Sequence, residues 1–130
     1  MDATTKTIQD GWGDGMSYDI RFAVKVDGTD IMANIGAPEY DSPTYNLGEM
    51  FRACTGWDYN QGEYYKCAEV LPLIEHGIKE LRFNRLDYLQ YEPDNGWGTL
   101  DGAIKVLESM REGIFEKAEE IPIEHLYICW

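Results

Sequence analysis

The sequence predicts a single α+β domain, in which a small antiparallel sheet is covered on one face by about three helices. The sheet is expected to consist of an N-terminal hairpin plus a C-terminal strand. Two segments of alternating apolar and polar residues predict the strands, and three segments with helical spacing of apolar residues predict the helices. The chain of 130 residues is long enough for one core but too short for two domains. We expect residues 1–15, which end in DGWGDG, to form a flexible arm, and residues 16–130 to form the domain.

The hairpin is predicted by the alternation of apolar and polar side chains over residues 16–26, followed by Asp27-Gly28. Asp-Gly is typical of a two-residue type I′ turn. Such a turn places Val24 opposite Ile31 and puts the apolar residues of both strands on the same face.

Three helices are predicted after the hairpin. Asn46 is the expected N-cap of the first helix and Gly56 its left-handed stop. The second helix is expected to begin near Glu69, and Thr99 is the expected N-cap of the third. Their predicted buried stripes are, in chain order, Leu47, Met50, Phe51 and Cys54; Cys67, Leu71, Ile74, Ile78 and Leu81; and Leu100, Ala103, Ile104, Leu107, Met110 and Ile114.

The C-terminal segment from His125 to Trp130 alternates again and predicts a strand that pairs with the first strand, which otherwise has a free edge. These periodic faces can all point at one surface of the sheet. We therefore expect one core that includes Ile20, Phe22, Val24, Ile31, Leu47, Phe51, Ile74, Leu107 and Ile128.

The composition is acidic, with 11 Lys and Arg against 24 Asp and Glu and a net charge of −13. This charge disfavours direct binding to nucleic acid or to an anionic membrane, and it is compatible with a basic protein partner. The acids are spread along the chain except for one cluster, which comprises Glu108, Glu112, Glu116, Glu119 and Glu120. An odd number of cysteines without paired spacing favours reduced thiols, and the chain has neither a leader pattern nor a run of apolar residues of membrane length. We expect a cytoplasmic protein.

No motif for catalysis or for cofactor binding is present, and only His76 and His125 could act as bases at neutral pH. A metal site is also disfavoured, because His125 and Cys129 on one strand would stand about 13 Å apart. We therefore expect a protein that is not an enzyme and that has no cofactor.

Binding is favoured by aromatic and polar residues that gather beside two of the helices, because rings stack on planar ligands and cations neutralise phosphate. The candidate ligand-binding residues are Tyr45, Asn46, Arg52, Trp57, Tyr59, Arg85, Asn95, Trp97 and Thr99. The alternative is that Trp57 and Trp97 close the ends of the fold and that Asn46 is only a helix cap.

From Met16 onward the chain resembles a group of small proteins encoded by bacteriophages and prophages. The resemblance rests on Met16-Ser-Tyr-Asp-Ile, on Thr44-Tyr45-Asn46 with Met50-Phe51-Arg52, and on Asn95-Gly96-Trp97-Gly98. Residues 1–15 lie outside it. The resemblance implies an accessory protein that acts against host defence by binding another molecule.

Three functional hypotheses follow. In the first, the protein sequesters a nucleotide-derived signalling molecule, with the pocket at a homo-oligomer interface. In the second, it is an acidic mimic of nucleic acid that inhibits a defence nuclease, with carboxylates in place of phosphates. In the third, it is a phage structural or assembly factor.

Overall fold

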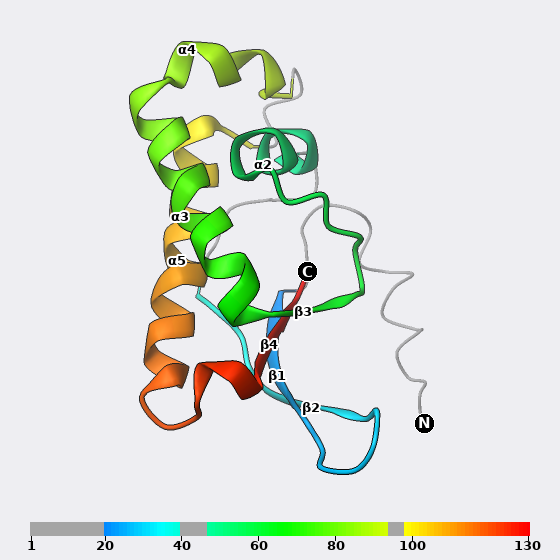
Figure 1. Cartoon of the computed structure of the whole chain (residues 1–130). Coiled ribbons are helices and arrows are strands. Elements are labelled where there is room, and N and C mark those ends of the chain that lie inside the picture. Colours follow the sequence, from blue (N-terminus) through cyan, green and yellow to red (C-terminus); the bar gives the residue numbers. More distant parts are fainter. Residues whose placement is uncertain (1–19, 40–46, 94–97) are drawn as a thin grey trace.

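The computed structural model describes residues 20–39, 47–93 and 98–130 (Figure 1). It confirms the α+β class, with a four-stranded antiparallel sheet in the order β2-β1-β4-β3. The predicted arm, the first residues of the predicted first strand and the predicted cap Asn46 lie outside the described residues. The elements are β1 (Arg21–Lys25), β2 (Met32–Gly36), α2 (Gly48–Thr55), β3 (Tyr64–Lys66), α3 (Cys67–Phe83), α4 (Arg85–Tyr88), the 3-10 turn η2 (Leu89–Tyr91), α5 (Leu100–Ala118), the 3-10 turn η3 (Ile123–His125) and β4 (Leu126–Cys129).

The hairpin is present, but its predicted register is wrong: Val24 stands opposite Ala33, not Ile31. Thr29 explains the longer connection. Its backbone N–H donates to the Val26 carbonyl (3.1 Å), and its Oγ1 accepts from the Ile31 N–H (3.0 Å). The connection therefore has four residues between Val26 and Ile31, whose backbone N–H···O bond (2.8 Å) closes it. From Ala23 to Val26 this is a shift of two residues, which preserves the face of each side chain. At Phe22 the register shifts by one further residue, so that Phe22 stands opposite Gly36.

The pairing of the C-terminal strand with the first strand is confirmed. In β4, Ile128 stands opposite Phe22 of β1, and on its other side it stands opposite Tyr65 of β3. The strand β3 was not predicted. It has three residues and leads directly into α3, so it is too short to show an alternation.

The helix ends are set by local chemistry. Gly56 closes α2 in the left-handed conformation (φ 73°), with its N–H bonded to the Arg52 carbonyl, as expected. Thr99 caps α5, as expected. The second helix begins at Cys67, before the expected start, so Pro72 lies inside the helix and not in its first turn.

The core lies between the sheet and the helices, where α3 and α5 run side by side along one face (Figure 1). Gly113 allows α5 to lie close to β1, because a Cβ there would be 2.6 Å from the Phe22 ring. Two predicted core residues are not buried: Val24 is half-buried and Ile31 is 62% exposed. The confirmed core residues are Ile20, Phe22, Leu47, Phe51, Ile74, Leu107 and Ile128. Within the described part of the chain, no helix has the length and apolar character needed to cross a bilayer.

Candidate functional site

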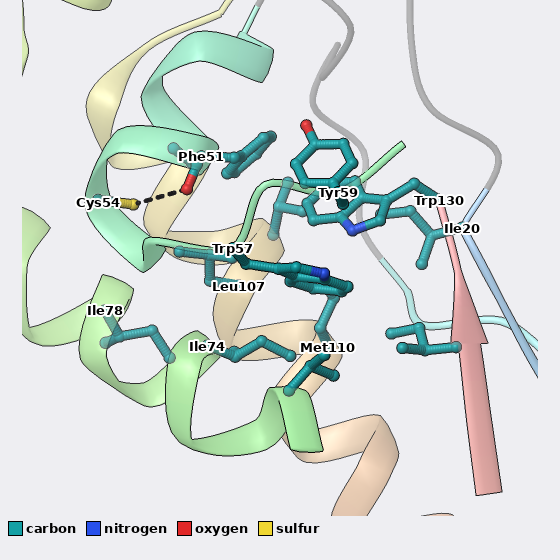
Figure 2. Close-up of a cluster of buried hydrophobic side chains, with 14 of the residues drawn as sticks. Ile20, Phe51, Cys54, Trp57, Tyr59, Ile74, Ile78, Leu107, Met110 and Trp130 are labelled. Carbon is teal, nitrogen blue, oxygen red and sulfur yellow. Dashed lines mark hydrogen bonds between the residues drawn. The ribbon is translucent and has the colours of Figure 1, made fainter. Parts of the chain in front are cut away.

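The predicted ligand-binding residues Trp57 and Tyr59 belong to a buried aromatic cluster beside α2 (Figure 2). Tyr59 stacks on Trp130, with ring centroids 4.3 Å apart and planes 10° apart, and Trp57 and Phe51 pack against the same indole at 5.6 and 5.0 Å. Trp57 is 4% exposed and Tyr59 1%. Each ring already has aromatic partners, so the core interpretation accounts for both residues without a ligand.

Arg52 belongs to the same cluster. Its guanidinium carbon lies 4.2 Å from the centre of the Tyr59 ring, and its Nε donates to the Tyr59 carbonyl (3.3 Å). Arg52 therefore fastens the segment after α2 to the helix, through a cation–π contact and a hydrogen bond. In contrast, the indole Nε1 of Trp57 is buried without a hydrogen-bond partner among the described residues.

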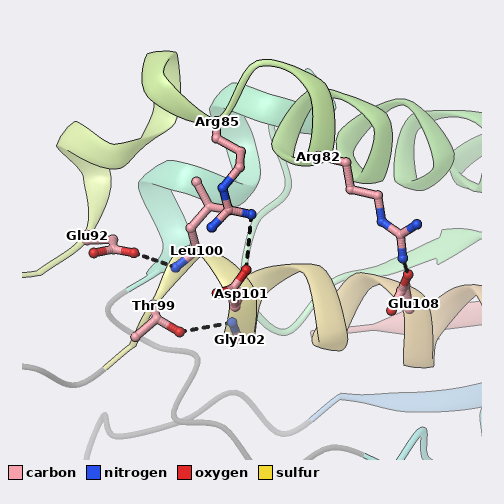
Figure 3. A network of polar contacts seen from close by, with 8 residues as sticks. All are labelled: Arg82, Arg85, Glu92, Thr99, Leu100, Asp101, Gly102 and Glu108. Atoms are coloured by element: carbon pink, nitrogen blue, oxygen red, sulfur yellow. Dashed lines mark hydrogen bonds and ion pairs between the residues drawn. The ribbon is translucent and has the colours of Figure 1, made fainter.

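The predicted residues Arg85 and Thr99 each contact a residue in the first turn of α5, Asp101 and Gly102 respectively (Figure 3). Thr99 Oγ1 accepts from the Gly102 N–H (2.9 Å), while the Glu92 carboxylate accepts from the Leu100 N–H (2.7 Å). Arg85 forms an ion pair with Asp101 at 3.0 Å. The first amides of the helix and this arginine are therefore occupied by groups of the chain itself, and a phosphate here would have to displace carboxylates.

The other predicted binding residues, Tyr45, Asn46, Asn95 and Trp97, lie outside the described residues. Their convergence into a pocket stays a prediction. Of the five described candidates, Arg52, Trp57 and Tyr59 lie together, and Arg85 and Thr99 lie together at a second place.

A polar contact near the C-terminal end of α3 joins this helix to α4. The Tyr88 hydroxyl donates to the Glu80 carboxylate (2.7 Å), to which the Asn84 side chain also donates (3.2 Å). The Tyr88 hydrogen bond is the main cause that lowers the pKa of Glu80. Partial burial, followed by this hydrogen bond, raises the pKa of Tyr88 to about 12.

An acidic groove of about 280 Å³ lies between α5 and the segment that follows β2. Its carboxylates are Glu112 and Glu116 of α5 and Glu39 from the facing segment, whereas Glu108 of the predicted acidic cluster is turned toward Arg82 of α3 (Figure 3). The other lining residues are Phe22, Ala37, Pro38, Ser109, Gly113 and Lys117. Sequence analysis singled out the α5 glutamates but missed Glu39, because nothing in the sequence places a residue after β2 beside α5.

A second, larger hollow of about 430 Å³ lies beside the hairpin turn, at the end of the sheet where β4 begins. Its polar residues include Lys25, Asp30, His125 and Tyr127. The fully exposed Asp30 forms a 3.4 Å ion pair with Lys25 there. Charges of both signs line this hollow, so it favours no single class of ligand.

The three cysteines are buried and free, as the sequence predicts. Burial raises the pKa of Cys54 and of Cys67 to about 12, so these thiols are poor nucleophiles at neutral pH. No group of three His, Cys, Asp or Glu side chains in the described ranges is arranged to hold a metal ion.

Comparison of the chain with protein-family models, with curated proteins and with solved structures found no match. The resemblance to phage accessory proteins therefore stays a prediction that rests on the short motifs of the sequence.

Proposed function

We propose that this chain is a binding protein that docks on a basic protein surface through the acidic groove of α5. The observation that carries the proposal is the position of Glu39, Glu112 and Glu116 around one hollow, whose lining also includes Phe22 and Pro38. Carboxylates from two segments of the chain thus face the same space. Such an arrangement attracts a cation more strongly than the same charges spread over a surface.

The groove has the chemistry to take a lysine or arginine side chain. Phe22 and Pro38, both buried, would contact the aliphatic stem, while the carboxylates at the rim would accept hydrogen bonds from the cationic head. Glu112 and Glu116 are four residues apart on α5 and therefore lie on the same side of the helix. Lys117 also lines the groove and offsets the charge of one carboxylate. Because this weakens the attraction for a single cation, we expect the partner to present several cations.

Together with the resemblance to phage proteins, this chemistry favours an inhibitor that covers the nucleic-acid groove of a defence nuclease. Such grooves are basic, and carboxylates can replace phosphates in them. The net charge of −13 supports attraction over a longer range, so association should weaken as ionic strength rises.

The proposal is tested by titrating the full chain with a short Lys- and Arg-rich peptide in a calorimeter at low and at high salt. We expect binding at low salt that is lost at about 1 M salt, where the screening length is about 3 Å. Glu112→Gln with Glu116→Gln should weaken binding at least tenfold. The matched control removes two exposed carboxylates elsewhere, Glu49→Gln with Glu69→Gln, and should retain most of the affinity. Equal loss in both double variants would mean that only net charge matters, and the groove would then have no role.

A second candidate function is sequestration of a nucleotide-derived signal. The observation that favours it is the position of Arg85 and Thr99 at the start of α5, directly after Asn95 and Trp97 in the sequence, where an anionic ligand would replace Asp101 as the partner of Arg85. The experiment is a thermal-shift screen against cyclic nucleotides and ADP-ribose derivatives. A ligand that stacks on Trp97 should lose about 1–3 kcal/mol of binding free energy in Trp97→Ala. If no nucleotide raises the melting temperature of the unmodified chain, this candidate is rejected.

A further inference from the structure

Among the residues that the structure describes, the strand β2 is the longer edge of the sheet and has a neighbouring strand on one side only (Figure 1). Its sequence, MANIG, contains neither a charged residue nor a proline. Proteins usually protect exposed edges with charged residues, with proline or with β-bulges, because an open edge pairs with any available strand. The register of β2 with β1 shifts near Gly36, but the five residues of this edge carry no charge, which is unusual in a chain of net charge −13.

The hydrogen-bonding pattern identifies which backbone groups point outward. Val26 and Ile31 form a hydrogen-bonded pair, and such pairs alternate along an antiparallel ladder. Val24 and Ala33 form the next hydrogen-bonded pair toward the other end of β1. The N–H and C=O groups of the intervening residues, Met32 and Asn34, therefore point away from β1.

The strand β2 also carries a row of apolar side chains. Ile31 is 62% exposed, and Ala33 and Ile35 follow it at alternate positions, so the three residues form a row on one face of β2. Ile35 packs against the core, but Ile31 extends past it. An exposed isoleucine beside an open edge provides apolar surface for a second strand.

We propose that β2 pairs antiparallel with β2 of a second copy of this chain, about a two-fold axis at Ala33. In this register Met32 of each copy stands opposite Asn34 of the other. The backbone N–H and C=O groups of these two pairs then form four hydrogen bonds. Ile31 then stands opposite Ile35 of the second copy. The two sheets become one sheet of eight strands, with both helical layers on the same side.

Charge is compatible with this register. No charged residue lies between Ile31 and Ile35, so like charges do not meet along the paired strands. At each end Asp30 of one copy stands opposite Gly36 of the other, and Lys117 Nζ lies 3.1 Å from the position that a Cβ of Gly36 would occupy. An acid and a base thus come to the same end of the interface, although the chain as a whole is strongly acidic.

The first test is the oligomeric state of the full chain by sedimentation velocity. One strand pair buries less than the roughly 800 Å² per partner of a standard interface, so we expect a weak dimer whose population rises with protein concentration. Ile31→Lys should keep the fold, because this side chain is exposed, and should remove the dimer. The control Phe83→Lys changes another exposed apolar residue, which is 80% exposed and lies at the end of α3, and should leave the dimer intact. A monomer throughout, or a dimer lost only in the control, would overturn the proposal.

The second test determines the register of the two β2 strands by disulfide cross-linking. In the proposed dimer, Ala33 of one copy stands opposite Ala33 of the other in a non-hydrogen-bonded pair. Their Cα atoms are about 4.5 Å apart, a distance that a disulfide can span. Ala33→Cys should therefore give a covalent dimer on mild oxidation. Asn34→Cys should not, because its Cα atoms would be about 9 Å apart across the axis. The native cysteines are buried and should not compete. Equal cross-linking of both variants would contradict this pairing.

Discussion

The C-terminal strand β4 and the hairpin of β1 and β2 have similar alternating sequence patterns but very different surroundings. In the closed half, β4 lies between β1 and β3, and Ile128 and Trp130 are at most 2% exposed. In the open half, the hairpin of β1 and β2 extends past the helices, and Val26 and Ile31 are 41% and 62% exposed. Alternation of apolar residues thus selects a face of a strand, whereas burial depends on what covers that face.

The largest expected effect is in the closed half. Trp130→Ala removes the ring that stacks on Tyr59 and contacts Phe51 and Trp57, and it should cost about 3–5 kcal/mol of unfolding free energy. In the open half, Val26→Ala should cost about 0.5 kcal/mol or less. Urea denaturation of both variants measures the difference. Similar losses would show that the hairpin is as closely packed as the aromatic cluster.

The next effect concerns the contact that brings α5 onto β1. Gly113→Ala places a methyl group 2.6 Å from the Phe22 ring, and the overpacking should cost about 1–3 kcal/mol. The higher helix propensity of alanine offsets only about 1 kcal/mol of this loss in unfolding free energy. The same substitution in a Phe22→Leu background should be less harmful, because the ring is gone. A double-mutant cycle by urea denaturation measures this coupling, and additive losses would exclude the clash as the cause.

A smaller effect is expected at the start of α5. Thr99→Ala removes the acceptor of the Gly102 N–H and should cost about 1 kcal/mol, while Thr99→Ser keeps the hydroxyl and should be nearly neutral. Thermal unfolding compares the two variants. Equal losses would point to the threonine methyl group and not to the cap.

The smallest effect is electrostatic and concerns α4, remote from both halves of the sheet. Tyr88→Phe removes the hydrogen bond that chiefly lowers the pKa of Glu80, so this pKa should rise toward its ordinary value. A lowered pKa in the folded state stabilises the protein above the pKa of the unfolded chain. This contribution is lost as the pH falls through the folded pKa, so the variant should lose less stability on acidification. An NMR titration of the Glu80 carboxyl tests this, with Asn84→Ala as the control that should shift the pKa less.

The candidate site was less predictable than the fold. The sequence indicated aromatic residues near α2 and predicted that they bind a ligand. Trp57 and Tyr59 are buried against Trp130, while Tyr45 and Trp97 lie outside the described residues, so the ligand site stays a prediction. Nothing local distinguishes a ring that stacks on a ligand from one that stacks on the C-terminal residue. Only the α5 side of the acidic groove could be predicted from the sequence, because Glu112 and Glu116 are close to each other in the chain and Glu39 is far from them.

The sequence by itself determined the fold class, the pairing of the C-terminal strand with the first strand, the cap of α5 and the left-handed stop of α2. The two helix ends depend on local hydrogen bonds, which a short segment contains in full, and the strands and helices depend on residue spacing. The pairing of the last strand with the first is long-range, but it was predictable because the first strand otherwise has a free edge. Only the tertiary structure decided the hairpin register, the strand β3, the exposure of Ile31 and the meeting of Glu39 with α5. These features depend on contacts between residues distant in the chain, whose positions result from packing of the whole core.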